Sequence, residues 1–95
     1  MKIYVKSNFV VPGLANGEFV DLDQSQLTMR EFLEELSRRA PKRIEYVRPG
    51  TQTINPDEWE ISINGIPSQQ WSAGLETSLK DGDTVTIIIV PLGGG

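Results

Sequence analysis

Alternating apolar and polar residues mark the first part of the chain as two strands. Residues 2–10 alternate, with an interruption at Ser7, and residues 18–23 alternate again. Residues 12–17 between them are turn-forming and end in Asn-Gly, which favours a tight connection. These three segments predict a β-hairpin. Its inward residues are expected to be Ile3, Val5 and Phe9 from the first strand, and either Phe19 or the pair Val20 and Leu22 from the second.

The next segment has the spacing of an amphipathic helix. Thr28 is a favourable N-cap, and Glu31, three residues later, completes a capping box. Leu27 and Phe32 occupy the positions of a hydrophobic staple, and Pro41 ends the helix. One apolar stripe recurs at helical spacing and predicts the face that packs on the core. It consists of Met29, Phe32, Leu33, Leu36 and Ala40.

The middle of the chain is irregular before a clear strand begins. Residues 41–56 predict either a second short helix with a loop or a mobile insertion. Residues 58–63 alternate cleanly and are followed by Asn64-Gly65, a turn signal. The inward face of this strand is expected to hold Trp59, Ile61 and Ile63.

The last third contains the strongest strand signal. Residues 66–78 predict a short strand or a single helical turn around Trp71. The pattern is equally compatible with burial of Trp71 in the core and with its exposure. Residues 80–83 form a tight turn, and residues 84–90 are apolar on both faces. A strand that is apolar on both faces is typical of a sheet centre. One face is expected to hold Val85, Ile87 and Ile89, and the other Ile88 and Val90.

The order of these elements predicts one α+β domain over residues 1–95. A hairpin, a helix crossover and further strands give a mixed sheet with one main helix packed on one face. This is the β-grasp (ubiquitin-like) arrangement. The first and last strands are the best candidates for the sheet centre, so a flexible tail of residues 91–95 would leave from the middle of the sheet.

Composition narrows the possible functions. The 95 residues include no cysteine and no histidine. This excludes disulfides, iron–sulfur ligation, thiolate nucleophiles, imidazole bases and nearly every zinc site, so no metal site is expected. The net charge of −4 argues against nucleic-acid binding. No apolar stretch approaches the roughly 20 residues of a membrane helix, and no signal-peptide pattern is visible, so we expect a cytoplasmic protein with no membrane partner.

Five of the nine positive charges gather at and after the end of the predicted helix. The favoured interpretation is that these cations complement the dipole at the C-terminal end of the helix. The alternative is a docking patch for an acidic partner. The five residues are Arg38, Arg39, Lys42, Arg43 and Arg48.

The tail directly after the strongest strand ends in three glycines. Glycine lacks Cβ, so a glycine backbone can approach another surface closely and enter a narrow active site. Terminal glycines also occur as frayed ends without function. The tail alone does not choose between these two interpretations.

Together with the preceding motifs, the tail resembles the end of the sulfur-carrier family of β-grasp proteins. That family includes the small subunit of molybdopterin synthase and the thiamine sulfur carrier. The resemblance rests on Ile63-Asn64-Gly65, on residues 79–85 and on residues 88–95.

The last six positions carry the closest likeness. Small subunits of molybdopterin synthase typically end in Pro-Pro-Val, a small residue and Gly-Gly. Pro91 aligns with the second proline, Leu92 with the valine, and Gly93 with the small residue. Val90 stands where the first proline is expected, which is a departure from the pattern.

The resemblance implies chemistry at the terminal carboxylate. An adenylating enzyme that resembles the ubiquitin activators would use ATP to convert the carboxylate of Gly95 to an acyl-adenylate, and sulfur would then replace AMP to give a thiocarboxylate. The carrier would bind no cofactor and would not itself be an enzyme. Gly94 and Gly93 would thread the partner tunnels, while Pro91 and Leu92 would set the direction of the tail and anchor it.

The resemblance also implies partners and leaves alternatives open. The carrier, a monomer when free, would deliver sulfur to the large subunit of molybdopterin synthase or to an equivalent acceptor enzyme. Thiamine, cysteine and tungsten-cofactor routes remain alternatives to the favoured molybdopterin route. A ubiquitin-like modifier joined to lysines through Gly95 and a binding module with an inert tail are the competing functions.

Overall fold

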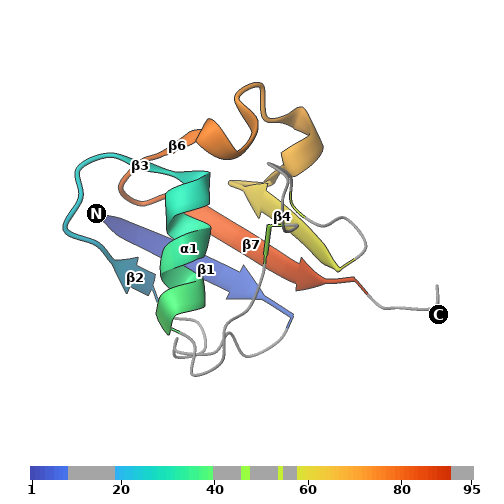
Figure 1. Cartoon of the computed structure of the whole chain (residues 1–95), viewed down its shortest axis with the longest axis horizontal. Helices are drawn as coiled ribbons and strands as arrows, with labels where there is room; N and C mark the ends of the chain where they lie inside the picture. Colours follow the sequence, from blue (N-terminus) through green and yellow to red (C-terminus); the bar gives the residue numbers. More distant parts are fainter. Residues whose placement is uncertain (9–18, 40–45, 48–53, 55–57, 91–95) are drawn as a thin grey trace.

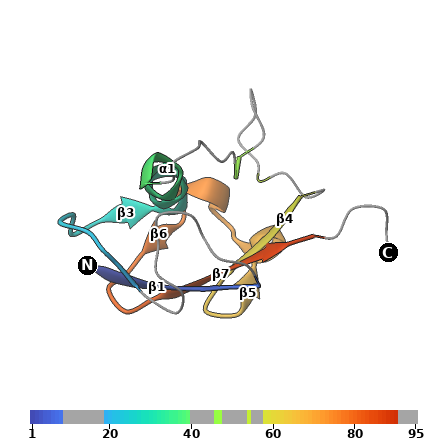
Figure 2. The same ribbon diagram turned by 90° about the horizontal axis from the view of Figure 1, so that it is seen from below.

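The computed structural model describes residues 1–8, 19–39, 46–47, 54 and 58–90. These residues form a five-stranded sheet in the order β2-β1-β7-β4-β5, with helix α1 across one face (Figures 1 and 2). The strands of this sheet are β1 (Lys2–Ser7), β2 (Phe19–Asp21), β4 (Trp59–Ile63), β5 (Ile66–Pro67) and β7 (Thr84–Ile89). The other elements are β3 (Leu27–Thr28), α1 (Met29–Arg39), β6 (Ser78–Leu79) and the single 3₁₀ turns η1 (Ser68–Gln70) and η2 (Gly74–Glu76).

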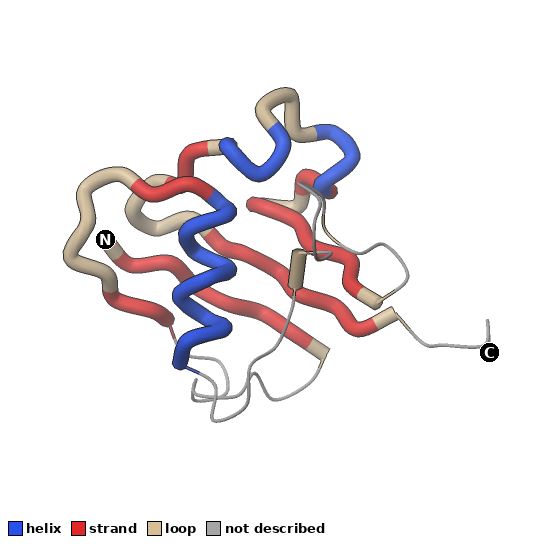
Figure 3. Tube along the Cα trace, viewed as in Figure 1, coloured by secondary structure: helices blue, strands red, loops and turns tan. Residues whose placement is uncertain are grey.

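Strand β7 is the middle strand of the large sheet. It runs parallel to β1, with Val5 opposite Val85, and antiparallel to β4, with Ile61 opposite Ile87. Figure 3 shows the strands of the sheet side by side in red, with the helix in blue. Val85 and Ile87 are both fully buried. The prediction that the last strand lies at the sheet centre is therefore confirmed, as are the mixed sheet and the α+β class.

The predicted hairpin is present, and its register resolves an open alternative. β1 and β2 pair antiparallel, with Ile3 opposite Val20. Val20 and Leu22 are buried, whereas Phe19 is 36% exposed, so Val20 and Leu22 face the core. Both strands are shorter than predicted, because β1 ends at Ser7 and β2 at Asp21. Phe9 and the predicted turn at residues 12–17 lie outside the described residues.

The Asn64-Gly65 signal gives the predicted tight turn. β4 and β5 pair antiparallel across it, with Ile63 opposite Ile66. Asn64 and Gly65 have φ values of 50° and 86°, the positive values that a type I′ hairpin turn requires. Trp71 is half-buried against the core, and its indole N–H donates a hydrogen bond of 2.8 Å to the carbonyl oxygen of Ile66. Trp71 therefore packs against the core, and its indole N–H is hydrogen-bonded within the protein.

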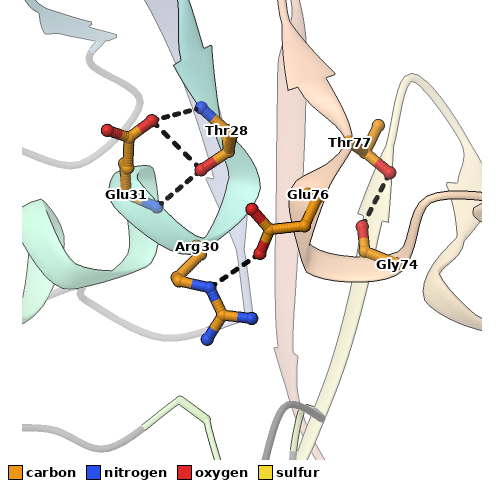
Figure 4. A network of polar contacts seen from close by, with 6 residues as sticks. All are labelled: Thr28, Arg30, Glu31, Gly74, Glu76 and Thr77. Atoms are coloured by element: carbon orange, nitrogen blue, oxygen red, sulfur yellow. Dashed lines mark hydrogen bonds and ion pairs between the residues drawn. The ribbon is translucent and has the colours of Figure 1, made fainter.

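The start of α1 has the predicted capping box (Figure 4). The backbone N–H of Thr28 donates to Glu31 Oε1 at 2.9 Å, and the N–H of Glu31 donates to Thr28 Oγ1 at 3.2 Å. β3 pairs with β6 immediately before the helix. Arg30 Nε donates to Glu76 Oε2 at 2.8 Å, which ties the first turn to η2. Short-range and long-range contacts thus fix the same end of the helix.

The core lies between α1 and the sheet. The predicted helical stripe is confirmed at Met29, Phe32, Leu33 and Leu36, which are all buried; Ala40 lies outside the described residues. Two predicted inward residues are not fully buried: Trp59 is half-buried and packs against the core, and Ile89 is 41% exposed. Ile89 keeps the alternation of β7 but lies at the end of the sheet, where β1 has already ended and β4 is only beginning at its partner Trp59.

Replacing Thr28 with alanine tests the capping box. We expect the free energy of unfolding to fall by about 1 kcal/mol, because the helix loses its side-chain cap. Urea unfolding followed by circular dichroism measures this loss. Ser25→Ala, a change in the exposed loop before the helix, is the matched control and should stay within about 0.5 kcal/mol of the wild type. Equal stability of the two variants would contradict the role of the cap.

Tyr46 brings a buried hydroxyl into the core. It is 2% exposed, and its ring centroid lies 4.7 Å from that of Trp59. Its Oη has no hydrogen-bond partner among the residues that the structure describes. Burial raises the pKa of Tyr46 above the usual 10.0, because the ionised phenolate would lose its hydration. The packing therefore favours the neutral phenol.

Tyr46→Phe tests this environment through its pH dependence. The unfolded chain releases the tyrosine proton near pH 10, before the folded chain does, so the wild type loses stability as the pH rises above about 10. The variant lacks this loss. At pH 7 it should equal or exceed the wild type in stability, because the buried hydroxyl loses hydration and has no hydrogen-bond partner among the described residues. Urea titrations at neutral and alkaline pH measure both effects, and a stability difference that does not change with pH would contradict them.

Candidate functional site

The candidate site begins where β7 ends. The predicted attachment residue Gly95 and the predicted partner-binding residues Pro91, Leu92, Gly93 and Gly94 lie outside the described residues, so their roles stay predictions. The structure describes the base of this tail, Ile89 and Val90, and the residues that hold it. The residue after β1 and the residue before β4 hold that base.

On the β4 side, the backbone extends the antiparallel ladder by one step beyond β7. The N–H of Val90 donates a hydrogen bond of 2.9 Å to the carbonyl oxygen of Glu58. Val90 precedes Pro91, and a residue before proline is restricted to extended backbone conformations. Pro91 has no N–H of its own to donate to a ladder. The bond at Val90 is therefore well placed as the last of the β4 ladder.

On the β1 side, a side chain takes over where the strand stops. β1 ends at Ser7, and the amide of the next residue, Asn8, holds Ile89. Asn8 Oδ1 accepts a hydrogen bond of 2.9 Å from the backbone N–H of Ile89, and Asn8 Nδ2 donates one of 3.3 Å to the carbonyl oxygen of Ile89. The side-chain amide thus replaces the peptide group that a longer β1 would present.

Asn8 was not identified by sequence reasoning. It lay within the predicted strand of residues 2–10, and its preference for turns was the one available signal that the strand ends there. Nothing local connects it with Ile89, which is 81 positions away. The same is true of Glu58, which acts through its carbonyl oxygen rather than its side chain.

The sheet face opposite α1 carries an exposed aromatic pair. Tyr4 and Phe19 are 44% and 36% exposed, and their ring centroids lie 5.9 Å apart in an edge-to-face arrangement. Lys2 Nζ lies 4.7 Å from the centre of the Phe19 ring. Tyr4 is opposite Thr84, the first residue of β7, so this surface lies near the end of β7 away from the tail.

The cations at the end of α1 are arranged as the favoured interpretation predicts. Arg38 and Arg39 lie in the last helical turn, and each forms an ion pair of 3.0 Å with Glu35. Lys42, Arg43 and Arg48 lie outside the described residues, so the docking alternative is not tested for them. Arg38 and Arg39 complement the helix dipole and a helical carboxylate.

Two other features are absent from the described residues, a cluster of metal ligands and a membrane-spanning helix. Among residues 1–8, 19–39, 46–47, 54 and 58–90, no group of three or more acidic side chains is placed to hold a metal ion. Within that part of the chain, no helix is long and apolar enough to span a bilayer. The base of the tail remains the feature that links the sequence motifs to the fold.

The sequence profile of the ThiS family matches residues 12–95, a range that includes the glycine tail. The chain belongs to the ThiS family. No curated protein and no solved structure matches the chain. The family assignment confirms the resemblance to sulfur carriers and the β-grasp fold.

ThiS-family membership supports a sulfur-carrier role in general. Members of the family are small carrier proteins rather than enzymes, and they work with an activating enzyme and a sulfur-acceptor enzyme. The family assignment does not determine the pathway that receives the sulfur. Ile89 and Val90, held by Asn8 and Glu58, are the described residues nearest in sequence to Gly95, whose role as the attachment residue stays a prediction.

Proposed function

We propose that this protein carries sulfur as a thiocarboxylate on Gly95 for the synthesis of molybdopterin. The observation that supports the carrier role most directly is the family match, which runs through the last residue of the chain. A second support is the base of the tail, because residues 89 and 90 continue the central strand and are hydrogen-bonded to neighbours on both sides.

The proposed activation uses the terminal carboxylate and an ATP-dependent partner. A carboxylate is ionised at neutral pH and is a poor electrophile. In the partner, a carboxylate oxygen of Gly95 attacks the α-phosphorus of ATP and pyrophosphate leaves. A sulfur nucleophile at the oxidation level of hydrosulfide then attacks the acyl carbon, and the bond from that carbon to the phosphate oxygen of AMP breaks. The product is the thiocarboxylate with free AMP.

The proposed transfer returns the carrier to its starting form. The thiocarboxylate sulfur attacks an electrophilic carbon of an acceptor held by the large subunit of molybdopterin synthase, and the bond from that carbon to its oxygen leaving group breaks. Water then cleaves the acyl–sulfur bond, so the sulfur stays on the acceptor and the carboxylate of Gly95 is regenerated. The molybdopterin route is favoured over thiamine and cysteine synthesis by the alignment of Pro91, Leu92 and Gly93 with the ending of the small synthase subunits.

Mass spectrometry tests the carrier role. After incubation with ATP, the adenylating enzyme and a sulfide source, we expect the intact protein to gain the mass of sulfur in place of one oxygen. A chain that lacks Gly94 and Gly95 is the control and should not gain it. Isopeptide ladders in cell extract without this gain would support a protein modifier instead. An unmodified mass together with no ladders would support a binding module with an inert tail.

The pathway is tested by offering the thiocarboxylate form to three acceptors. We expect molybdopterin to form with the large synthase subunit, while the thiazole synthase of thiamine formation and a carrier-dependent cysteine synthase remain inactive. Product formation by either of the other two acceptors, without molybdopterin, would refute the favoured route but leave the carrier role intact.

Replacing Gly94 with leucine tests the need for a tail without side chains. We expect the rate of thiocarboxylate formation to fall by about 100-fold, because a side chain displaces the reacting carboxylate in a narrow active site. The midpoint of unfolding should not change. Ala73→Leu places the same side chain on an exposed residue between η1 and η2 and serves as the control. A normal rate with Gly94→Leu would contradict the proposal that glycine threads the partner.

A further inference from the structure

The base of the tail is held on both sides by different kinds of groups. Along β7, successive residues direct their N–H and C=O groups alternately toward β1 and toward β4. At Val90 the neighbour on the β4 side is still backbone, the carbonyl oxygen of Glu58. At Ile89 the neighbour on the β1 side is the side chain of Asn8, because β1 has ended at Ser7.

The two bonds from Asn8 fix more than one atom of Ile89. Oδ1 binds the N–H and Nδ2 binds the C=O of the same residue, so both peptide planes that flank its Cα are restrained. The bond from Val90 to Glu58 restrains the next N–H from the opposite side. Three hydrogen bonds therefore hold the backbone of Ile89 and Val90, the two residues that precede Pro91 in the sequence.

We propose that Asn8 is a positioning residue for activation of the tail. It contacts neither ATP nor the reacting carboxylate; it acts by holding Ile89 so that the tail leaves the sheet in one direction. This inference rests on the proposed function, because it assigns a role within the same sulfur-carrier reaction. It names a residue near the start of the chain as a determinant of chemistry at the end.

Because Asn8 is exposed, a role in positioning the tail can be distinguished from a role in stabilising the fold. Its amide lies at the surface, where water competes for the same hydrogen bonds, so its removal should leave the protein largely folded. A residue that only stabilised the fold would lower the folded fraction, which raises the apparent KM and leaves kcat unchanged. A residue that positions the tail should act after the body has docked, and its loss should lower kcat at an unchanged KM.

The chain provides a matched control at the other end of β7. Asn64 Oδ1 accepts a hydrogen bond of 2.9 Å from the N–H of Thr84, the same kind of bond at the same distance as that from Asn8 to Ile89. Asn64 has a positive φ of 50°, which glycine tolerates, so Asn64→Gly removes the amide without forcing the turn to change.

The first measurement is amide hydrogen exchange by NMR. In Asn8→Ala we expect the N–H of Ile89 to exchange about tenfold faster, as the loss of one net hydrogen bond implies, while the N–H of Thr84 is unchanged. Asn64→Gly should give the reverse pattern. Unchanged exchange at Ile89 in Asn8→Ala would overturn the proposal, because the side chain would not be holding the strand in solution.

The second measurement is steady-state adenylation with the ATP-dependent activating enzyme, with the carrier concentration varied. For Asn8→Ala we expect kcat to fall about tenfold with KM within about twofold of the wild type. Asn8→Asp keeps the acceptor for the Ile89 N–H and loses the donor, so its kcat should lie between the two. Asn64→Gly should keep the wild-type kcat.

The outcomes distinguish the positioning role of Asn8 from the proposed sulfur-carrier function. A wild-type kcat for Asn8→Ala, or an equal fall in kcat for Asn64→Gly, would overturn the positioning role while the carrier function stands. Failure of the wild-type chain to be adenylated would overturn the proposed function and the role of Asn8 in it. In that case the exchange data would still show whether Asn8 holds Ile89.

Discussion

The central position of β7 is the constraint on which the rest of the structure depends. This strand is hydrogen-bonded to β1 in parallel and to β4 in antiparallel orientation, and it supplies the buried residues Val85 and Ile87. The hairpin, the helix and β4 are all arranged around it. Because the residue after β7 already belongs to the base of the tail, the most constrained part of the fold leads directly into the part proposed to react.

Both ends of β7 are secured by an asparagine side chain rather than by a neighbouring backbone alone. Asn64 binds the N–H of Thr84 at the start of the strand, and Asn8 binds Ile89 at its end. A protein without cysteine or histidine lacks thiolate nucleophiles and imidazole bases. Under the proposed function, the contribution of the body is geometric, because it determines where the main-chain terminus is presented to an enzyme.

The sequence predicted features whose partners are close in the chain. The capping box joins Thr28 to Glu31, and the tight turn at Asn64 joins adjacent strands, so both could be read from a few residues. The centre of the sheet was also predictable, because β7 is apolar on both faces. The tail residues stay predictions that rest on family likeness, since they lie outside the described residues.

Features that depend on distant neighbours could not be read in this way. Period-two patterning placed Ile89 with Val85 and Ile87, but its exposure depends on where β1 and β4 end. The hydrogen bonds of Asn8 leave no periodic signal, because a surface amide adds nothing to the apolar pattern. Its partner can be found only when the register between the first and last strands is known.

The parallel pairing of β1 with β7 also bears on how the protein folds. It joins residues from the two ends of the chain, and the bond from Asn8 to Ile89 closes a loop across 81 positions. Contacts of such high sequence separation are slow to form, because the entropy of closing the loop is lost before the contact stabilises the chain. During synthesis this pairing must wait until β7 has left the ribosome. The pairing of β1 with β7 and the placement of Ile89 against Asn8 therefore form together, so the base of the tail takes its position only when the sheet is complete.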